Sequence, residues 1–317
     1  MLLQASNLTI GYGNHIVQHH LNLVAEVGDL ICLTGLNGSG KSTLLRTLAG
    51  LQKSLGGHIT FRGKDVGKLT NEERAKLFAL VLTDNIAVEN LTIHDLVAMG
   101  RLPYTGWSGN LSANDEKIVK ESLAQVNLLH KSESLICEVS DGEKQRGVIA
   151  KALAQDTPLV LLDEPTAHLD LPNRIEIMLL LRRLSVHTRK TFILSTHELD
   201  LALQMADKIW LMGNDGVQVG VPEDLMLTGK FQETFGSTAF RFDETDGHCK
   251  INHLLGTLTV AVTGESPATL WLERALFRCG ISVVPNADIV IEAHQGCFRL
   301  QNQEVHSIEE VLHHLLC

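Results

Sequence analysis

Short apolar runs separated by turn-forming residues mark the start of the chain. Residues 2–10 and 16–27 have the composition of strands, and the turn-forming segment 11–14 separates them. The apolar run 30–34 comes next, followed by a glycine-rich stretch and by residues 42–49, whose apolar positions have helical spacing. This order predicts a strand, a loop and a helix.

The pattern becomes helical between about residues 91 and 153, with clear periodicity over 93–99 and 116–128 and a glycine-containing loop at 103–109. Two short apolar runs, 159–162 and 191–195, follow with a helical pattern between them. Such alternation is typical of buried parallel strands with crossover helices. We therefore predict an α/β domain over residues 1–242 that contains a helical subdomain at about 86–157.

A polar stretch at 243–248 reads as a linker, after which a second pattern begins. The segments with strand or helix periodicity in this tail are 258–262, 268–278, 281–284, 288–292, 297–300 and 307–316. They predict a small C-terminal α/β domain over residues 248–317.

Composition narrows the class of protein. The 317 residues are 44% hydrophobic, enough for two ordinary cores, and the formal net charge of -10 argues against a broad nucleic-acid-binding surface. The six cysteines form no C-x-x-C pair, which fits reduced thiols. No basic start with an apolar block and no apolar run of about 20 residues is present, so we expect any membrane association to go through a partner.

A phosphate-binding loop of the form G-x-x-x-x-G-K-[ST] lies between the predicted strand and helix at residues 35–43. Its backbone N–H groups and the helix N-terminus suit phosphates, Lys41 reaches the β and γ phosphates, and Ser42 offers a hydroxyl to Mg²⁺. We expect the nucleotide to contact Gly35, Asn37, Gly38, Ser39, Gly40, Lys41, Ser42 and Thr43.

Two carboxylates, Asp163 and Glu164, follow the apolar run 159–162 directly. An open α/β sheet presents its ligand site at this end of its strands. Asp163 is the candidate Mg²⁺ ligand, directly or through water, and Glu164 is placed to orient or deprotonate the attacking water.

With these motifs on the same chain, residues 1 to about 240 resemble an ABC ATPase. Residues 139–143, VSDGE, resemble the family signature L-S-G-G-Q, which in that family caps the γ-phosphate of an ATP held by the opposite subunit. Ser140 and Gly142 lie before a predicted helix, whose N-terminus favours anions. A lone serine at this position is more often only a helix N-cap.

Three further residues gain roles from the resemblance. Asp170, in the segment 166–170, matches the D-loop that touches the partner subunit, and His197 matches the switch histidine that contacts the γ-phosphate. Tyr12 matches the aromatic residue that stacks on adenine, although a tyrosine between two glycines also suits simple turn packing. The resemblance thus implies Lys41, Glu164 and His197 as the catalytic group.

The sequence departs from the family pattern at two places. No glutamine is present near residues 81–85, where the family has one beside the Mg²⁺ site, so Thr83 or Asp84 takes that place and Asp84 is a candidate metal ligand. The signature carries Asp141 and Glu143 where glycine and glutamine are usual, which adds negative charge near a phosphate site.

The segments 96–104 and 167–174 resemble the ATPases of bacterial iron-siderophore, haem and cobalamin importers. The resemblance implies ATP and Mg²⁺ as cofactors, an ATP-sandwich dimer, permease subunits, an external binding protein acting indirectly, and a place on the cytoplasmic face of the cell membrane. The alternatives are a soluble ABC ATPase acting on ribosomes or DNA, and an inactive nucleotide sensor. In the tail, two clusters suggest a metal-sensing or iron-sensing role, although neither has the spacing of a closed zinc site: His248, Cys249 and His253, and His313, His314 and Cys317.

Overall fold

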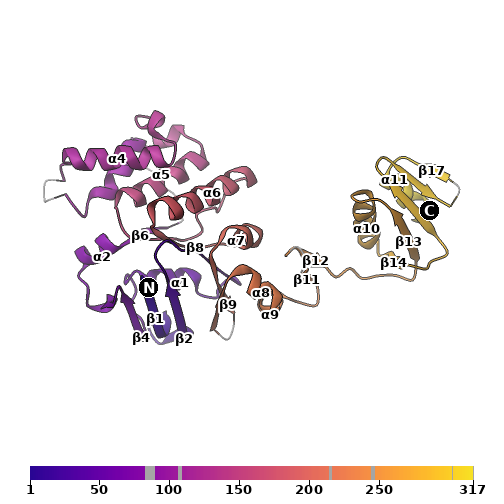
Figure 1. Cartoon of the computed structure of the whole chain (residues 1–317), viewed down its shortest axis with the longest axis horizontal. Helices are drawn as coiled ribbons and strands as arrows, with labels where there is room; N and C mark the ends of the chain where they lie inside the picture. The colour runs from indigo at the N-terminus through magenta and orange to yellow at the C-terminus, as the bar shows by residue number, and fades with distance from the viewer. Residues whose placement is uncertain (83–89, 106–108, 214–215, 244–246, 302, 317) are drawn as a thin grey trace. The chain divides into compact units, whose positions relative to one another are not determined.

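The computed structural model describes residues 1–82, 90–105, 109–213, 216–243, 247–301 and 303–316. The chain forms two compact units (Figure 1). The N-terminal unit comprises Met1–Gly236 and Phe242–His248, and the C-terminal unit comprises Ser237–Arg241 and Cys249–Cys317.

A six-stranded sheet forms the centre of the N-terminal unit, in the order β10-β9-β3-β8-β7-β6. The neighbours from β9 to β6 are parallel, and β10 is antiparallel to β9. The strands are β3 (Leu30–Gly35), β6 (Phe78–Val81), β7 (Leu159–Leu162), β8 (Thr191–Ser195), β9 (Lys208–Gly213) and β10 (Gly216–Gly220).

The parallel strands are apolar throughout because both faces of the sheet are covered. In β3, Leu30 and Cys32 belong to one core cluster, while Ile31 and Leu33 belong to another. The second cluster also includes helix α1 (Lys41–Leu48) and the four-stranded antiparallel sheet β2-β1-β4-β5. Helix α1 is therefore held between two sheets.

The antiparallel sheet consists of β1 (Leu3–Tyr12), β2 (His15–Ala25), β4 (Gly56–Phe61) and β5 (Lys64–Asp65). Its connection to the larger sheet runs through the short helix Val66–Lys68 and α2 (Asn71–Leu77). Helix α2 begins with a capping box between Thr70 and Glu73, which satisfies the first backbone N–H groups of the helix.

A helical region covers the other face of the six-stranded sheet. It contains α3 (Ile93–Ala98), α4 (Ala113–Gln125), α5 (Asp141–Ala154) and α6 (Leu171–Thr188), with short turns of helix at 99–101, 129–131 and 136–138. Thr92, Ser112 and Ser140 each cap a helix and form a capping box. The unit ends with α7 (Leu199–Met205), α8 (Pro222–Leu227) and α9 (Lys230–Phe235).

The C-terminal unit is built on a five-stranded sheet in the order β14-β13-β15-β16-β17. Its elements are β13 (Thr259–Gly264), α10 (Ala268–Arg278), β14 (Ser282–Val283), β15 (Val290–His294), β16 (Cys297–Leu300), β17 (Gln303–Val305) and α11 (Ile308–Leu316). Both helices contribute to one apolar core with the sheet. Two further strands, β11 (Phe240–Phe242) and β12 (Cys249–Ile251), pair with each other.

The predicted fold class is confirmed, since an α/β core with mixed sheets and a helical region is joined to a small α/β unit. The predicted strands at 159–162 and 191–195 are β7 and β8, and the predicted helix at 268–278 is α10. The domain limits 1–242 and 248–317 stay predictions. Among the helices of the described ranges, none combines the length and the apolar content that crossing a bilayer requires.

A buried ion pair ties the helical region together. Arg101 donates from Nε to Asp115 Oδ1 at 2.9 Å and from a terminal nitrogen to the Ala154 carbonyl at 2.7 Å, and the side chains of the ion pair are 5% and 9% exposed. Hydrogen bonds from Ser112, and then the Arg101 guanidinium, lower the pKa of Asp115 to about 2. One arginine thus joins the start of α4 to the end of α5.

Replacing Arg101 with alanine is expected to lower the free energy of unfolding by about 3 kcal/mol, because the Asp115 carboxylate stays buried without its guanidinium. Chemical denaturation of the full chain measures this difference. Lys117→Ala is the matched control, since Lys117 is exposed on α4, the helix that carries Asp115. Its replacement should lower the free energy of unfolding by less than about 0.5 kcal/mol. Equal unfolding midpoints for the two variants would contradict the role of the pair.

The stability that the Arg101–Asp115 pair contributes should decrease at low pH. Because the pKa of Asp115 is lowered, its contribution to stability is complete above the ordinary value of 3.8 and is lost as the pH falls through about 2. The stability difference between the wild type and Arg101→Ala should therefore shrink on acidification over this range. A difference that is independent of pH would exclude the ionised Asp115 as its source.

Candidate functional site

The phosphate loop connects the end of β3 to the start of α1. Gly40 is the N-cap residue of α1 and has φ 102°, in the left-handed region that favours glycine. A Cβ on Gly40 would also come within 2.5 Å of Val17 Cγ1. The backbone therefore turns into the helix with its first N–H groups free of side-chain caps, as an anion site requires.

Lys41 folds back over this loop and is only 6% exposed. Its Nζ donates to the carbonyls of Gly35 at 3.0 Å and Leu36 at 3.2 Å. Burial lowers the pKa of Lys41 from its ordinary value, and the nearby carboxylates of Glu164 and Asp163 act in the opposite direction. The ammonium group is thus held at the loop, with two acids near it.

Asp163 lies where three strands end. Its Oδ1 accepts hydrogen bonds from Ser42 Oγ at 3.0 Å and from Ser195 Oγ at 2.7 Å. Its backbone N–H donates to the Val81 carbonyl at the end of β6 at 2.8 Å. The structure therefore brings together the predicted metal-site residues Ser42 and Asp163, while Asp84 and Thr83 lie outside the described residues.

Glu164 has φ 49°, a conformation that a residue with a side chain rarely adopts. Its backbone N–H donates to Ser195 Oγ at 2.8 Å, which holds this turn in place. Its carboxylate Oε1 lies 3.0 Å from His197 Nε2, and both side chains are partly exposed. Two of the predicted catalytic residues are therefore in direct contact at the end of the sheet.

Two residues of the site were missed from the sequence. Ser195 bridges the side chain of Asp163 and the backbone of Glu164, and it is fully buried. Gln18, which is 6% exposed, donates from Nε2 to the carbonyls of Gly213 at 2.9 Å and Ser39 at 3.4 Å. Nothing in the local sequence around a glutamine in a strand predicts that it will hydrogen bond to the phosphate loop.

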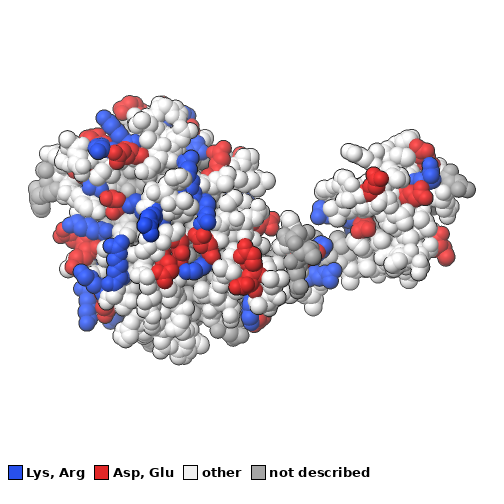
Figure 2. All heavy atoms as spheres, in the orientation of Figure 1, with Lys and Arg blue, Asp and Glu red and all other residues white. Residues whose placement is uncertain are grey.

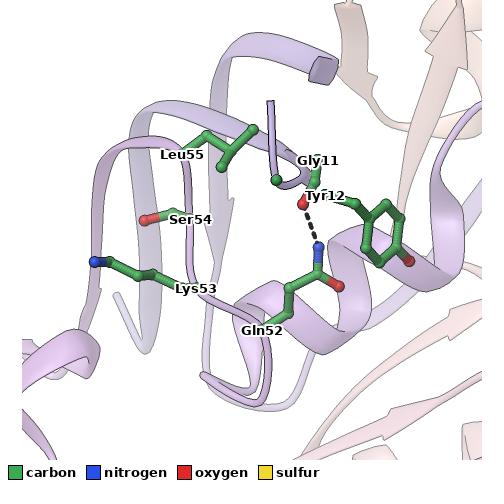
Figure 3. A pocket seen from close by; sticks show the side chains of 7 residues that line it. Gly11, Tyr12, Gln52, Lys53, Ser54 and Leu55 are labelled. Carbon is green, nitrogen blue, oxygen red and sulfur yellow. Dashed lines mark hydrogen bonds between the residues drawn. The ribbon is translucent and has the colours of Figure 1, made fainter. Parts of the chain in front are cut away.

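Tyr12 ends β1 beside the phosphate loop, with its hydroxyl 2.9 Å from Thr43 Oγ1. Its side chain is 51% exposed and borders a hollow of about 480 Å³ lined by residues 11–13 and 52–55. In Figure 3, Gln52 points toward Gly11 and hydrogen bonds to its carbonyl, with the Tyr12 ring close by. The ring is therefore available for stacking while its hydroxyl is anchored to the loop.

The predicted signature begins helix α5, with Ser140 as its N-cap. Ser140 donates from its backbone N–H at 2.9 Å and from Oγ at 3.1 Å to Glu143 Oε2. Glu143 also pairs with Lys131 at 2.6 Å, and hydrogen bonds from Lys131 and Ser140 lower its pKa to about 2. Asp141 pairs with Lys144 at 3.0 Å. Both unusual acids of the signature thus have cationic partners within the chain.

The signature also packs against the start of α6. A Cβ on Gly142 would come within 2.3 Å of Asn173 Oδ1, so only glycine fits without a shift of that side chain. Asn173 Nδ2 donates to Asp170 Oδ1 at 2.6 Å, and Asp170 is the N-cap of α6. The structure therefore brings together the predicted residues Gly142 and Asp170 through Asn173.

Charges of both signs are interspersed over the N-terminal unit on the face shown in Figure 2. Lys and Arg side chains lie beside Asp and Glu side chains there. The continuous basic surface that typifies nucleic-acid binding is not seen on this face.

Comparisons with known proteins show which family this chain resembles. A family model described as ABC transporter matches residues 18–167, and one described as iron ABC transporter C-terminal domain matches residues 257–316. An uncharacterised ABC transporter ATP-binding protein of Methanocaldococcus jannaschii is 38% identical over 253 residues, which are 80% of this chain and 87% of that protein.

Two relatives have named transport systems. A petrobactin import ATP-binding protein of Bacillus anthracis is 34% identical over 74% of this chain and 87% of its own length. An iron(3+)-hydroxamate import ATP-binding protein of Bacillus subtilis is 37% identical over 64% of this chain and 76% of its own length.

A solved ATP-binding cassette, dimeric and bound to ADP and Pi after hydrolysis, superposes with a TM-score of 0.60 at 25% identity. The match covers 70% of this chain and 99% of that one. The fold and the phosphate loop therefore define a P-loop ATPase. The chain belongs to the ABC transporter family, as one of its ATP-binding, ATP-hydrolysing proteins.

Replacing Ser195 with alanine is expected to reduce stability by about 2 kcal/mol, because Asp163 loses a donor and the Glu164 N–H loses its buried acceptor. Steady-state ATPase assays should show a lower kcat with a smaller change in KM. Ser185→Ala is the matched control, since Ser185 is also buried but donates only to Arg182 within its own helix. Unchanged kcat in Ser195→Ala would contradict the positioning role.

Proposed function

We propose that this chain is the ATP-hydrolysing subunit of an importer for iron-siderophore complexes, bound to permease subunits at the cytoplasmic face of the cell membrane. An external binding protein delivers the cargo to the permease in this proposal. The observation that carries it is the pairing of an ABC ATPase site with a tail that matches the iron ABC transporter C-terminal model over residues 257–316. The named iron-chelate import systems of the relatives support the same cargo class.

In the proposed site, the phosphate loop from Gly35 to Thr43 holds the phosphates of ATP, and Tyr12 stacks on adenine. The Lys41 ammonium exchanges its two loop carbonyls for phosphate oxygens. Ser42 and Asp163, with a hydroxyl and a carboxylate oxygen 3.0 Å apart, are hard oxygen donors of the kind that Mg²⁺ prefers. These two residues would hold Mg²⁺, which supplies charge neutralisation on the β and γ phosphates when bound.

Glu164 is the proposed base for the attacking water. Its carboxylate takes no part in the hydrogen bonds that Ser42 and Ser195 make to Asp163. It is oriented by His197, whose Nε2 lies 3.0 Å from Glu164 Oε1. His197 is also placed to contact the γ-phosphate and so to respond to hydrolysis. Positioning of water and phosphate by such groups supplies most of the catalysis in phosphoryl transfer.

The proposed active form is a dimer of this chain, with each ATP between Lys41 of one copy and Ser140 and Gly142 of the other. Asp170 lies at the same contact. ATP binds both halves only when the dimer is closed, so hydrolysis can return it to an open state. This alternation is what a permease needs to change between two conformations.

Neither alternative function is favoured. The two relatives with named systems are import ATP-binding proteins, which gives no support to action on ribosomes or DNA. An inactive sensor is also disfavoured, because Lys41 lies at the phosphate loop, Glu164 contacts His197, and the acids of the signature are paired within the chain.

Replacing Glu164 with glutamine should lower ATP turnover by about 10²–10⁴-fold, because the amide cannot accept a proton from water. ATP binding should persist, and the variant should accumulate as an ATP-loaded dimer in size-exclusion chromatography. Glu176→Gln is the control, since Glu176 is exposed on α6 and pairs only with Arg146 among the described contacts. Wild-type turnover in Glu164→Gln would remove Glu164 from the role of base.

The partner assignment is tested by purifying the tagged chain from its native membrane and identifying co-purifying proteins by mass spectrometry. A many-helix permease, together with a binding protein for iron chelates, is the expected result. Recovery of ribosomal or DNA-binding proteins without a permease would overturn the importer while leaving the ATP site intact.

A further inference from the structure

A cluster of metal-ligating side chains lies in the C-terminal unit, which does not contain the phosphate loop. One ligand atom from each of Cys297, Glu304 and His306 lies within 4.8 Å of the other two. Among the described residues this is the one group of three or more such side chains that close together. His248, Cys249 and His253, which the sequence suggested, do not form such a group.

The strand register explains why these residues meet. In the antiparallel pairs of β16, Cys297 is opposite His294 of β15, and Arg299 is opposite Glu304 of β17. Side chains alternate between the faces of a sheet, so Cys297, His294 and Glu304 share one face, together with His306, two residues beyond Glu304.

The opposite face of the same strands is fixed in the core. Phe298 and Val305 are paired across β16 and β17 and are only 5% and 4% exposed. A slip of one residue would expose both, so the register that gathers the ligand atoms is strongly specified. Cys297 and Glu304 therefore lie on paired strands, and His306 lies one residue beyond the end of β17.

The distances suit a small cation. In a tetrahedral site with bonds of about 2.0–2.3 Å, ligand atoms lie roughly 3.5 Å apart. Cys297 Sγ and Glu304 Oε1 are already 3.1 Å apart, and the remaining separations need to close by about 1.3 Å at most. Cys297 is half-buried while Glu304 and His306 are exposed, so an ion can reach the ligands from solvent.

We propose that Cys297, Glu304 and His306 bind one divalent transition-metal ion of the Zn²⁺ class. A thiolate and imidazoles select borderline metals such as Zn²⁺ over Mg²⁺ or Ca²⁺. By the general order of affinities, Fe²⁺ binds the same ligands more weakly than Zn²⁺. The site does not depend on the proposed transport function.

In the metal-free cluster, Cys297 and Glu304 share a hydrogen bond that a bound ion has to replace. The Cys297 thiol donates to Glu304, and this hydrogen bond raises the pKa of the thiol. Binding forms the Sγ–metal bond and releases the thiol proton to solvent. Arg299, the cation on the same face, lies 3.3 Å from Glu292, so a carboxylate other than Glu304 pairs with it.

Zn²⁺ titration of the metal-stripped full chain by isothermal calorimetry tests the site. The wild type should bind one Zn²⁺ tightly, and Cys297→Ser and His306→Ala should each bind it at least about tenfold more weakly. The control is the double variant His313→Ala, His314→Ala, which removes the histidine pair of α11 and should bind as the wild type does. Circular dichroism and ATP binding verify that each variant is folded.

Co²⁺ provides a spectroscopic readout of the thiolate ligand. Its complex with the wild type and with the α11 control should show a thiolate-to-cobalt charge-transfer band, which Cys297→Ser should lack. Absence of Zn²⁺ binding by the wild type would overturn the proposal. Undiminished affinity in Cys297→Ser and His306→Ala, or loss of binding only in the α11 control, would overturn it equally.

Discussion

The ATP site depends on Asp163, because this residue is hydrogen-bonded to three segments that are distant in sequence. Ser42 at the start of α1 and Ser195 at the end of β8 both donate to Oδ1, and the Asp163 N–H donates to the end of β6. These contacts exist because β3, β8, β7 and β6 are consecutive parallel neighbours whose carboxyl ends meet at one edge. The buried sheet thereby brings Lys41, Glu164 and His197 to the same edge, because they follow β3, β7 and β8.

The altered signature shows how local pairing can absorb charge at a phosphate site. Glu143 caps helix α5 by accepting from Ser140 and also pairs with Lys131, while Asp141 pairs with Lys144. A carboxylate in the first turn of a helix is stabilised by the exposed backbone N–H groups. The extra acids therefore reinforce the N-terminus of α5. In this arrangement the backbone N–H and the hydroxyl of Ser140 both donate to Glu143.

The C-terminal unit follows a different construction. Its apolar core lies beneath the hairpin of β16 and β17, and the proposed metal ligands lie on the outward face of those strands or just beyond β17. Strand alternation separates the two functions residue by residue, so Phe298 and Val305 stabilise the unit while Cys297, Glu304 and His306 are left available. This arrangement allows ligand chemistry to be added to a small unit without removing apolar area from its core.

The sequence by itself determined the phosphate loop, the acids after β7, the fold class and most elements of the tail, because each depends on residues close together in the chain. Sequence did not reveal β17 as a strand, and it suggested different ligand clusters in the tail. Only the tertiary structure placed Gln18 and Ser195 in the ATP site, paired Glu143 with Lys131, and set Cys297 beside Glu304 and His306. The physical reason is tertiary in each case: sheet order and strand register bring Gln18, Ser195 and the ligands of the tail to their partners, and the fold of the helical region brings Lys131 to Glu143. No local pattern of residues encodes these distances.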